Sequence, residues 1–120
     1  MPFPSLLKEL SKIKEFINDN NREKPNLKMY PRIEDGVLLG ISVRFYFPKG
    51  YSEGAEKVVF ARIEELSKGV LIPNKSDLIW RGVLELNVNY VGQRLDSWSV
   101  RQALIFISED MIKMLLYGAL

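Results

Sequence analysis

Cysteine and histidine are both absent from this sequence of 120 residues. Their absence excludes disulfides, thiolate and imidazole metal ligands, cysteine nucleophiles and the commonest general base. The sequence also contains no glycine-rich phosphate loop and no nucleophile elbow. We therefore expect a protein that is not an enzyme and that uses no cofactor or metal. The absence of cysteine further suits a reducing cytoplasm, where we expect the protein to act.

The sequence has little excess of one charge, because 17 lysines and arginines are balanced by 15 aspartates and glutamates, for a net charge of +2. So small a net charge creates no long-range field that draws the whole protein onto a polyanion. Any affinity for nucleic acid must therefore come from a local cluster of residues. A charged fraction of 27% is also typical of thermophilic proteins.

Long apolar runs of the kind that span a membrane are missing as well. The most apolar stretch, residues 103–120, is interrupted by Ser108, Glu109, Asp110 and Lys113. The N-terminal residues contain no compact apolar run of the signal-peptide type. A chain of this length is sufficient to bury one hydrophobic core. We therefore expect a single domain, residues 1–120, with no membrane partner.

The first half of the chain predicts a helix followed by a β-hairpin. Over residues 5–20, apolar side chains recur at helical spacing: Leu6, Leu10, Ile13 and Ile17. Asp35-Gly36 suits a two-residue turn between strands at 27–34 and 37–47. Pro31 has no N–H to donate to a ladder, so the first of these strands should form a sheet edge. In the second strand, strict alternation places six residues on the core face: Val37, Leu39, Ile41, Val43, Phe45 and Phe47.

The second half predicts two further strands and a helix. Residues 57–66 combine β-branched residues, which favour a strand, with a helix-forming end, and we predict a strand. Residues 77–91 alternate between apolar and polar side chains and predict another strand, with Trp80 facing the core. A final helix runs to about Tyr117, with Gly118 at its C-terminal cap. This order predicts an α+β fold, a two-layer sandwich in which an N-terminal and a C-terminal helix cover one face of a four-stranded antiparallel sheet.

The face of the sheet opposite the helices is left to solvent or to a partner. The predicted alternation gathers cations and rings there: Arg44, Tyr46, Phe60, Arg62 and Arg81, with Lys49 and Tyr51 in the adjacent loop. Single-stranded DNA or RNA requires cations for phosphates and aromatic rings for bases. Trp98 adds either another stacking platform or a hydrophobic anchor for the final helix. In the alternative interpretation this face packs against a second copy, with its arginines paired to Glu64 and Glu85.

The final helix carries two apolar strips, which is more than one sheet face requires. One strip consists of Val100, Leu104, Ile107, Met111 and Met114. We interpret this strip as the oligomer interface of a homodimer. In the alternative interpretation the first helix covers both strips within one chain.

Taken together, a helix, an antiparallel sheet with a basic and aromatic cleft, and an apolar C-terminal helix resemble the ThermoDBP group of archaeal single-stranded-DNA-binding proteins. The resemblance implies sequence-tolerant binding of single strands in the cleft and dimerisation through the C-terminal helix. The positions that match this description are Arg44, Tyr46, Phe60, Arg62 and Arg81 for the cleft, and Leu104, Ile107 and Met111 for the dimer.

The element order is also similar to that of small secretion-chaperone-like domains, which are dimeric protein-interaction modules. These domains carry a further helix between strands, which this chain would supply only if residues 53–66 were helical. Their acidic balance is missing here. A third interpretation is a small subunit of a larger assembly, docked through the two-sided final helix.

Overall fold

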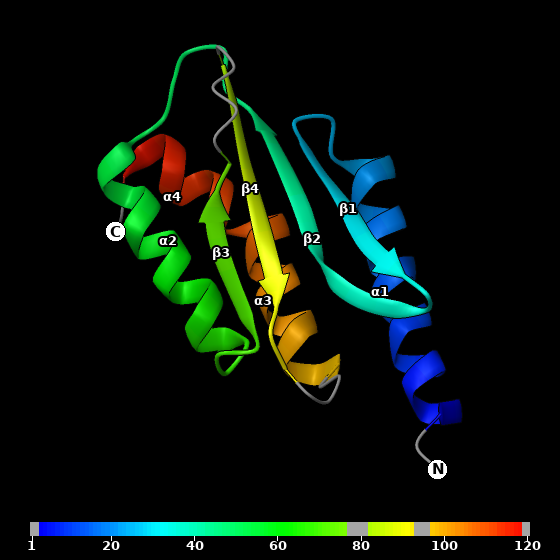
Figure 1. Ribbon diagram of the computed structural model, residues 1–120. Coiled ribbons are helices and arrows are strands. Elements are labelled where there is room, and N and C mark those ends of the chain that lie inside the picture. The colour runs from blue at the N-terminus through cyan, green and yellow to red at the C-terminus, as the bar shows by residue number, and fades with distance from the viewer. Residues whose placement is uncertain (1–2, 77–81, 93–96, 119–120) are drawn as a thin grey trace.

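The computed structural model describes residues 3–76, 82–92 and 97–118 (Figure 1). Within these ranges the chain forms α1 (Phe3–Glu23), β1 (Leu27–Glu34), β2 (Val37–Tyr46), α2 (Glu53–Leu66), β3 (Leu71–Lys75), β4 (Val83–Tyr90), α3 (Ser97–Glu109) and α4 (Met111–Tyr117). The strands make one antiparallel sheet in the order β1-β2-β4-β3. The predicted α+β class and four-stranded antiparallel sheet are confirmed, but the described residues form four helices rather than two. None of these described helices is both long and apolar enough to cross a membrane.

The hairpin of β1 and β2 forms as the sequence predicts. Asp35 and Gly36 both adopt positive φ angles, 52° and 76°. Such angles are those of a tight two-residue hairpin turn, which asparagine, aspartate and glycine tolerate best. β1 lies at one end of the sheet, so the edge position predicted from Pro31 is confirmed.

A β-bulge shifts part of β2 out of the predicted phase. Leu39 has no partner at a step in the register between Arg32 and Ile33. One extra residue reverses the alternation between the bulge and the turn. Leu38 is therefore buried, whereas Val37 and Leu39 are 57% and 42% exposed, and the prediction that these two face the core is wrong. The other four predicted core residues of this strand are buried: Ile41, Val43, Phe45 and Phe47.

Residues 57–66 are helical, so the strand predicted there is wrong. Ser52 caps α2 by accepting a hydrogen bond from the Ala55 amide at 3.4 Å. The buried residues Ala55, Val59 and Ile63 recur every four positions. This helical period, set by contact with the core, outweighs the β propensity of valine and isoleucine.

The strand predicted at residues 77–91 is confirmed in its second part. β4 carries Leu84, Leu86 and Val88, which are buried as the alternation predicts. Residues 77–81, which include Trp80, lie outside the described residues. The neighbour of β4 at the second sheet edge is β3, which contains Pro73 and lies beside α2 (Figure 1).

The helices and the inner side of the sheet enclose one hydrophobic core. Figure 1 shows α1 and α3 behind the sheet, with α2 alongside β3, and α2 also contacts α3 and α4. Inside this core the Ser108 hydroxyl donates a hydrogen bond of 2.7 Å to Asn20 Oδ1, which joins α3 to α1. α2 is thus an additional helix that the predicted arrangement of two terminal helices lacked.

The predicted final helix is divided at Asp110 into α3 and α4, and Gly118 caps α4 with a φ of 84°. Four of its five predicted interface residues are completely buried within the single chain: Val100, Leu104, Ile107 and Met111. Met114 is half-buried against the same core. The assignment of these four side chains to a homodimer interface is therefore corrected. They pack inside one chain and offer no surface to a second copy. The alternative interpretation, in which the first helix covers both strips, is not borne out either, because α2 as well as α1 lies against α3, and α2 also lies against α4.

Candidate functional site

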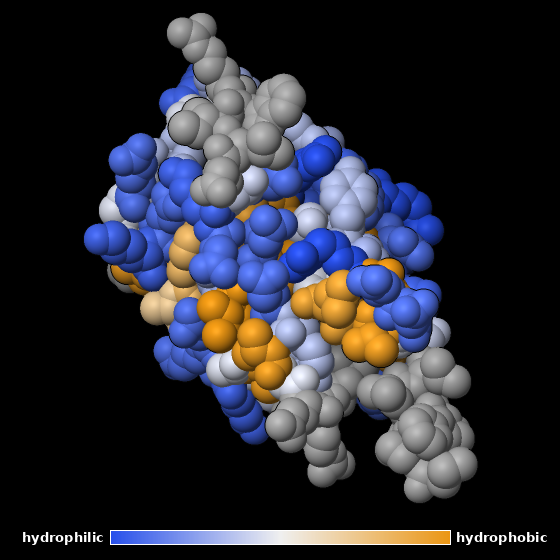
Figure 2. Space-filling view, viewed as in Figure 1, coloured by the Kyte–Doolittle hydropathy of each residue, from blue (hydrophilic) through white to orange (hydrophobic). Residues whose placement is uncertain are grey.

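One face of the sheet is left uncovered by the described helices, and we call it the open face. Along β4 the buried leucines and valine alternate with outward residues that are half-buried. The same period of two applies to the other strands. The open face comprises Lys28, Tyr30, Arg32, Glu34, Ser42, Arg44, Tyr46, Ile72, Asn74, Val83, Glu85, Asn87 and Asn89, together with Val37 and Leu39, which the bulge turns outward. Figure 2 views this side of the molecule and shows hydrophilic surface across its middle, with separate hydrophobic areas to either side.

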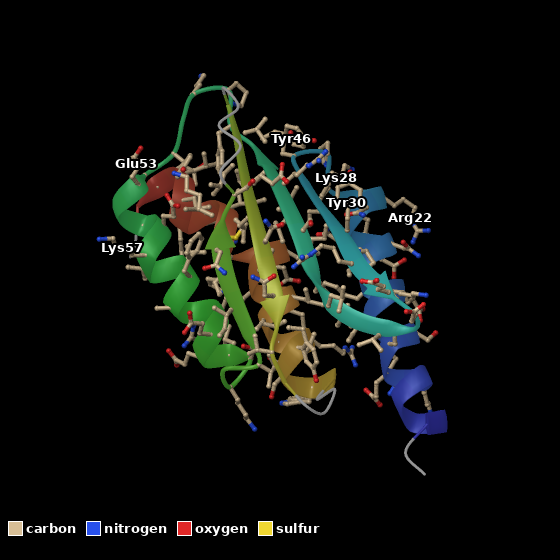
Figure 3. The ribbon with its side chains drawn as sticks, in the orientation of Figure 1. Arg22, Lys28, Tyr30, Tyr46, Glu53 and Lys57 are labelled. Atoms are coloured by element: carbon tan, nitrogen blue, oxygen red, sulfur yellow. The ribbon has the colours of Figure 1, made fainter. Side chains whose placement is uncertain are left out.

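Four of these side chains form the tyrosine–arginine cluster: Lys28, Tyr30, Arg44 and Tyr46. Lys28 lies opposite Arg44 in the register of β1 and β2. The Arg44 guanidinium carbon lies 5.7 Å from the centre of the Tyr30 ring, which is within cation–π range. Both tyrosines are exposed, and Figure 3 shows Lys28, Tyr30 and Tyr46 near the same end of β1 and β2. The cluster therefore presents two rings and two cations close together on one surface.

Lys28 and Tyr30 are candidates that sequence reasoning missed. The predicted face was assembled from the three later strands, and β1 was treated only as an edge. The signal was present, because Leu27 and Met29 alternate with Lys28 and Tyr30. With the apolar pair facing the core, a period of two places the lysine and the tyrosine on the open face.

The charges of the tyrosine–arginine cluster are partly satisfied within the protein. Arg44 Nε lies 3.4 Å from Glu85 Oε2 on the neighbouring strand β4, and Lys28 Nζ donates to the Asn21 carbonyl. These contacts reduce the repulsion between two cations that lie directly opposite each other. On the described part of the open face, three basic side chains, Lys28, Arg32 and Arg44, accompany two carboxylates, Glu85 and, at the turn end of β1, Glu34. The surface thus keeps a local excess of positive charge despite the low net charge of the chain.

Arg32 crosses the middle of the sheet. Its Nη2 donates a hydrogen bond of 2.5 Å to Asn89 Oδ1 on β4, although β2 lies between the two strands. Gly40 makes this crossing possible, because a Cβ at that position would collide with the Arg32 guanidinium and lie 2.5 Å from the Val88 carbonyl oxygen. Arg32 Nε is buried and has no hydrogen-bond partner among the described residues.

The structure separates the residues that were predicted to share this face. Arg44 and Tyr46 lie on it, as expected from the alternation of β2. Phe60 and Arg62 lie on α2, where Phe60 packs against the core and Arg62 Nη1 pairs with Glu65 Oε1 at 2.8 Å. Their predicted placement on the sheet is therefore wrong. Arg81 lies outside the described residues.

Tyr51 belongs to the junction of β2, α2 and β3 rather than to the open face. Its ring centre lies 4.8 Å from that of Phe47, and its hydroxyl donates to Glu56 Oε2 at 3.2 Å. Lys75 Nζ lies 3.6 Å from the same carboxylate oxygen and 5.8 Å from the Tyr51 ring centre. Burial raises the pKa of the Tyr51 hydroxyl. The hydrogen bond with Tyr51 in turn raises the pKa of the Lys75 ammonium.

The two remaining predicted site residues are exposed. Lys49 lies in the loop between β2 and α2. Trp98 lies in the first turn of α3 and is 66% exposed. Both predicted roles of Trp98, stacking platform and hydrophobic anchor, stay predictions, and its exposure leaves the ring accessible to a partner.

A hollow of about 490 Å³ lies between α2, α3 and α4. Its apolar lining consists of Leu66, Ile105, Phe106 and Met114. Its polar lining consists of Arg62, Gln102, Asp110 and Lys113. This size and mixture of side chains are typical of sites that hold a small molecule or an apolar side chain of a partner protein.

The described residues contain no group of three or more acidic side chains that could hold a metal ion. What the open face offers is stacking surface, positive charge and amide groups. No protein-family model, no curated protein and no solved structure matches this chain.

Proposed function

We propose that the open face binds single-stranded nucleic acid in a largely sequence-tolerant way. The observation that carries the proposal is the tyrosine–arginine cluster, in which the Arg44 guanidinium lies over the Tyr30 ring with an exposed Tyr46 beside it. Every base has a π-face, so an exposed tyrosine ring can stack with any of them, contributing roughly 1–3 kcal/mol per base. The neighbouring cations supply partners for phosphates.

Single strands fit this surface better than duplexes do. In a duplex the π-faces of the bases are stacked on one another, and side chains reach only the base edges. The tyrosine rings on the open face can stack only where those π-faces are accessible. In this proposal the chain acts as a two-layer unit, with helices on one side of the sheet and nucleic acid on the other. The cysteine-free composition supports a cytoplasmic location.

The proposal is tested by fluorescence anisotropy of a labelled single-stranded oligonucleotide, with DNA and RNA in parallel and with unlabelled duplex as competitor. Two arginines form a matched pair of variants, because their side chains are 47% and 48% exposed and each pairs with a glutamate. Arg44→Gln on the open face should weaken binding roughly tenfold, as expected for a lost charged contact. Arg62→Gln on α2 should leave it within about twofold. Equal losses in the two variants, or no binding by the native chain at low salt, would overturn the proposal.

A second candidate function is that of a protein-interaction module. The observation that favours it is α2, because residues 53–66 are helical and thus supply the helix between strands that secretion-chaperone-like domains carry. The hollow between α2, α3 and α4 would then receive an apolar side chain of the partner, which includes the case of a larger assembly. This candidate expects a complex that is stable on light scattering and little affected by salt. Nucleic-acid binding, in contrast, weakens steeply as salt rises.

A further inference from the structure

The amide of Asn89 has a defined orientation. A guanidinium group donates hydrogen bonds and accepts none. The atom of Asn89 that lies 2.5 Å from Arg32 Nη2 is therefore its carbonyl oxygen, Oδ1. The two N–H donors of the same amide have no partner among the described residues.

Asn87 repeats this arrangement two residues earlier on β4. The Ser42 hydroxyl donates to Asn87 Oδ1 at 3.4 Å, which again leaves the amide N–H donors without a partner in the described part of the chain. Two residues apart on one strand face means a spacing of about 7 Å between the two amides. The carboxylate next along this face, that of Glu85, is paired with Arg44.

The side-chain oxygens of Asn87 and Asn89 are thus engaged within the protein, while the N–H donors of these two amides are left over. The row that crosses the strands here runs from Tyr30 through Ser42 to Asn87. Neighbouring strands are about 4.8 Å apart, so Asn87 lies about 10 Å from Tyr30 across the sheet. In the proposed arrangement, a nucleotide whose phosphate is held by the cations of the tyrosine–arginine cluster extends its base from β2 toward β4, beside a neighbouring base that stacks on Tyr30. The base then presents to the two amides the edge that lies farthest from its sugar.

We propose that Asn87 and Asn89 make the open face prefer keto bases, uracil, thymine and guanine, over the amino bases cytosine and adenine. On the base edge that lies farthest from the sugar, uracil and thymine present the O4 acceptor, and guanine presents O6 and N7. Cytosine presents an N4 donor and adenine an N6 donor, each of which faces another donor on this surface. The inference rests on the proposed function and adds the class of base that binds best. Stacking still accepts every base, so the preference is a graded one.

The test compares two labelled single-stranded oligonucleotides of equal length, one of deoxyuridine and one of deoxycytidine. Their rings have the same size, and they differ in the keto or amino group at position 4 and in the proton on N3. We expect deoxyuridine to bind roughly two- to tenfold more tightly, the value of one net hydrogen bond. In the double variant Asn87→Asp with Asn89→Asp, which replaces amide donors by acceptors, the ratio of the two affinities should fall to one or reverse.

The control is Asn18→Asp, an equal change of charge per residue at an exposed position of α1. We expect this control variant to lower the affinities for the two oligonucleotides by the same factor and to leave their ratio unchanged. Circular dichroism and thermal unfolding establish that each variant is folded. Equal affinity of the native chain for the two oligonucleotides overturns the base preference but leaves the proposed function intact. A ratio unchanged in the folded double variant overturns the role of the two asparagines, and binding of neither oligonucleotide overturns the proposed function itself.

Discussion

The Arg44 guanidinium and the Tyr30 ring, 5.7 Å apart, come from adjacent antiparallel strands and face away from the hydrophobic core. Tyr30 is exposed even though the arginine lies over it. One side of the pair is therefore held by the sheet, and the other is open to a ligand. This geometry leads to two expectations for binding, and the rest of the fold leads to three for stability.

Removal of the Tyr30 ring should weaken binding of single strands. Tyr30→Ala deletes one stacking surface, for which we expect a loss of roughly fivefold or more in affinity. Tyr30→Phe keeps the ring and should stay within about twofold of the native chain. Tyr117→Ala, at an exposed position on α4, serves as the control in anisotropy measurements. A loss as large for Tyr30→Phe as for Tyr30→Ala would speak against stacking.

The salt dependence of binding should report on Lys28. For single strands the logarithm of the affinity falls with the logarithm of the salt concentration, with a slope of about 0.7 per phosphate contacted. Lys28→Gln removes one such contact and should reduce the slope by about 0.7. The control is Lys57→Gln, an exposed lysine on α2 (Figure 3), which should keep the native slope. Identical slopes in all three proteins would place Lys28 outside the binding surface.

Gly40→Ala should destabilise the sheet. The new methyl group would lie 2.5 Å from the Val88 carbonyl oxygen and would displace the Arg32 guanidinium. Because the obstacle includes backbone, we expect a loss of about 1–3 kcal/mol in the free energy of unfolding, measured by urea denaturation. Gly54→Ala is the matched control, since the nearest atom to its new Cβ is 4.0 Å away. A Gly40→Ala variant as stable as the native chain would contradict the close approach.

Leu104→Ala should act on stability and not on association. Leu104 is completely buried within the single chain, so truncation leaves a cavity that lowers the free energy of unfolding by about 2–5 kcal/mol. Leu116→Ala, at a position that is 45% exposed, should cost less than about 1 kcal/mol. Elution from a sizing column should be the same for both folded variants. A folded Leu104→Ala variant that dissociates a native oligomer would restore the interface predicted from the sequence.

Stability should fall at alkaline pH through Tyr51 and Lys75. Both pKa values are raised in the folded chain above their ordinary values of 10.0 and 10.5. The folded state therefore holds these protons more tightly, and the resulting stabilisation is present below about pH 10 and is lost as the pH rises further. Tyr51→Phe removes one group and its hydrogen bond to Glu56, so thermal unfolding of this variant should depend less on pH above pH 10. Tyr117→Phe should keep the native dependence.

The hairpin was predictable because its determinants are local. Asp35-Gly36 specifies the turn, and Pro31 marks the edge. The bulge at Leu39 was not predictable, because no particular residue type marks a bulge of this kind. Its effect is to reverse which residues of β2 face the core between the bulge and the turn. Residues 57–66 illustrate the limit of propensity. The side chains of Val59 and Ile63 favour a strand, but a helix buries both of them against the core, and this tertiary contact outweighs the propensity.

The candidate site was predictable only where its determinants are local, within a single strand. Alternation along β2 was enough to place Arg44 and Tyr46 on the open face. Their neighbours depend on strand pairing, which the sequence does not display locally. Arg44 was expected to share its face with Phe60 from the next strand, whereas its partners in the register are Lys28 on one side and Glu85 on the other.

The prolines of the two outer strands limit how this molecule can join others. Pro31 on β1 and Pro73 on β3 each interrupt the row of N–H groups along an edge, and β3 is further flanked by α2. Neither edge offers an uninterrupted row of N–H groups to an added strand, so growth of the sheet from chain to chain into a fibril is disfavoured at both edges. Faces and helices are therefore the more favourable surfaces for a larger assembly.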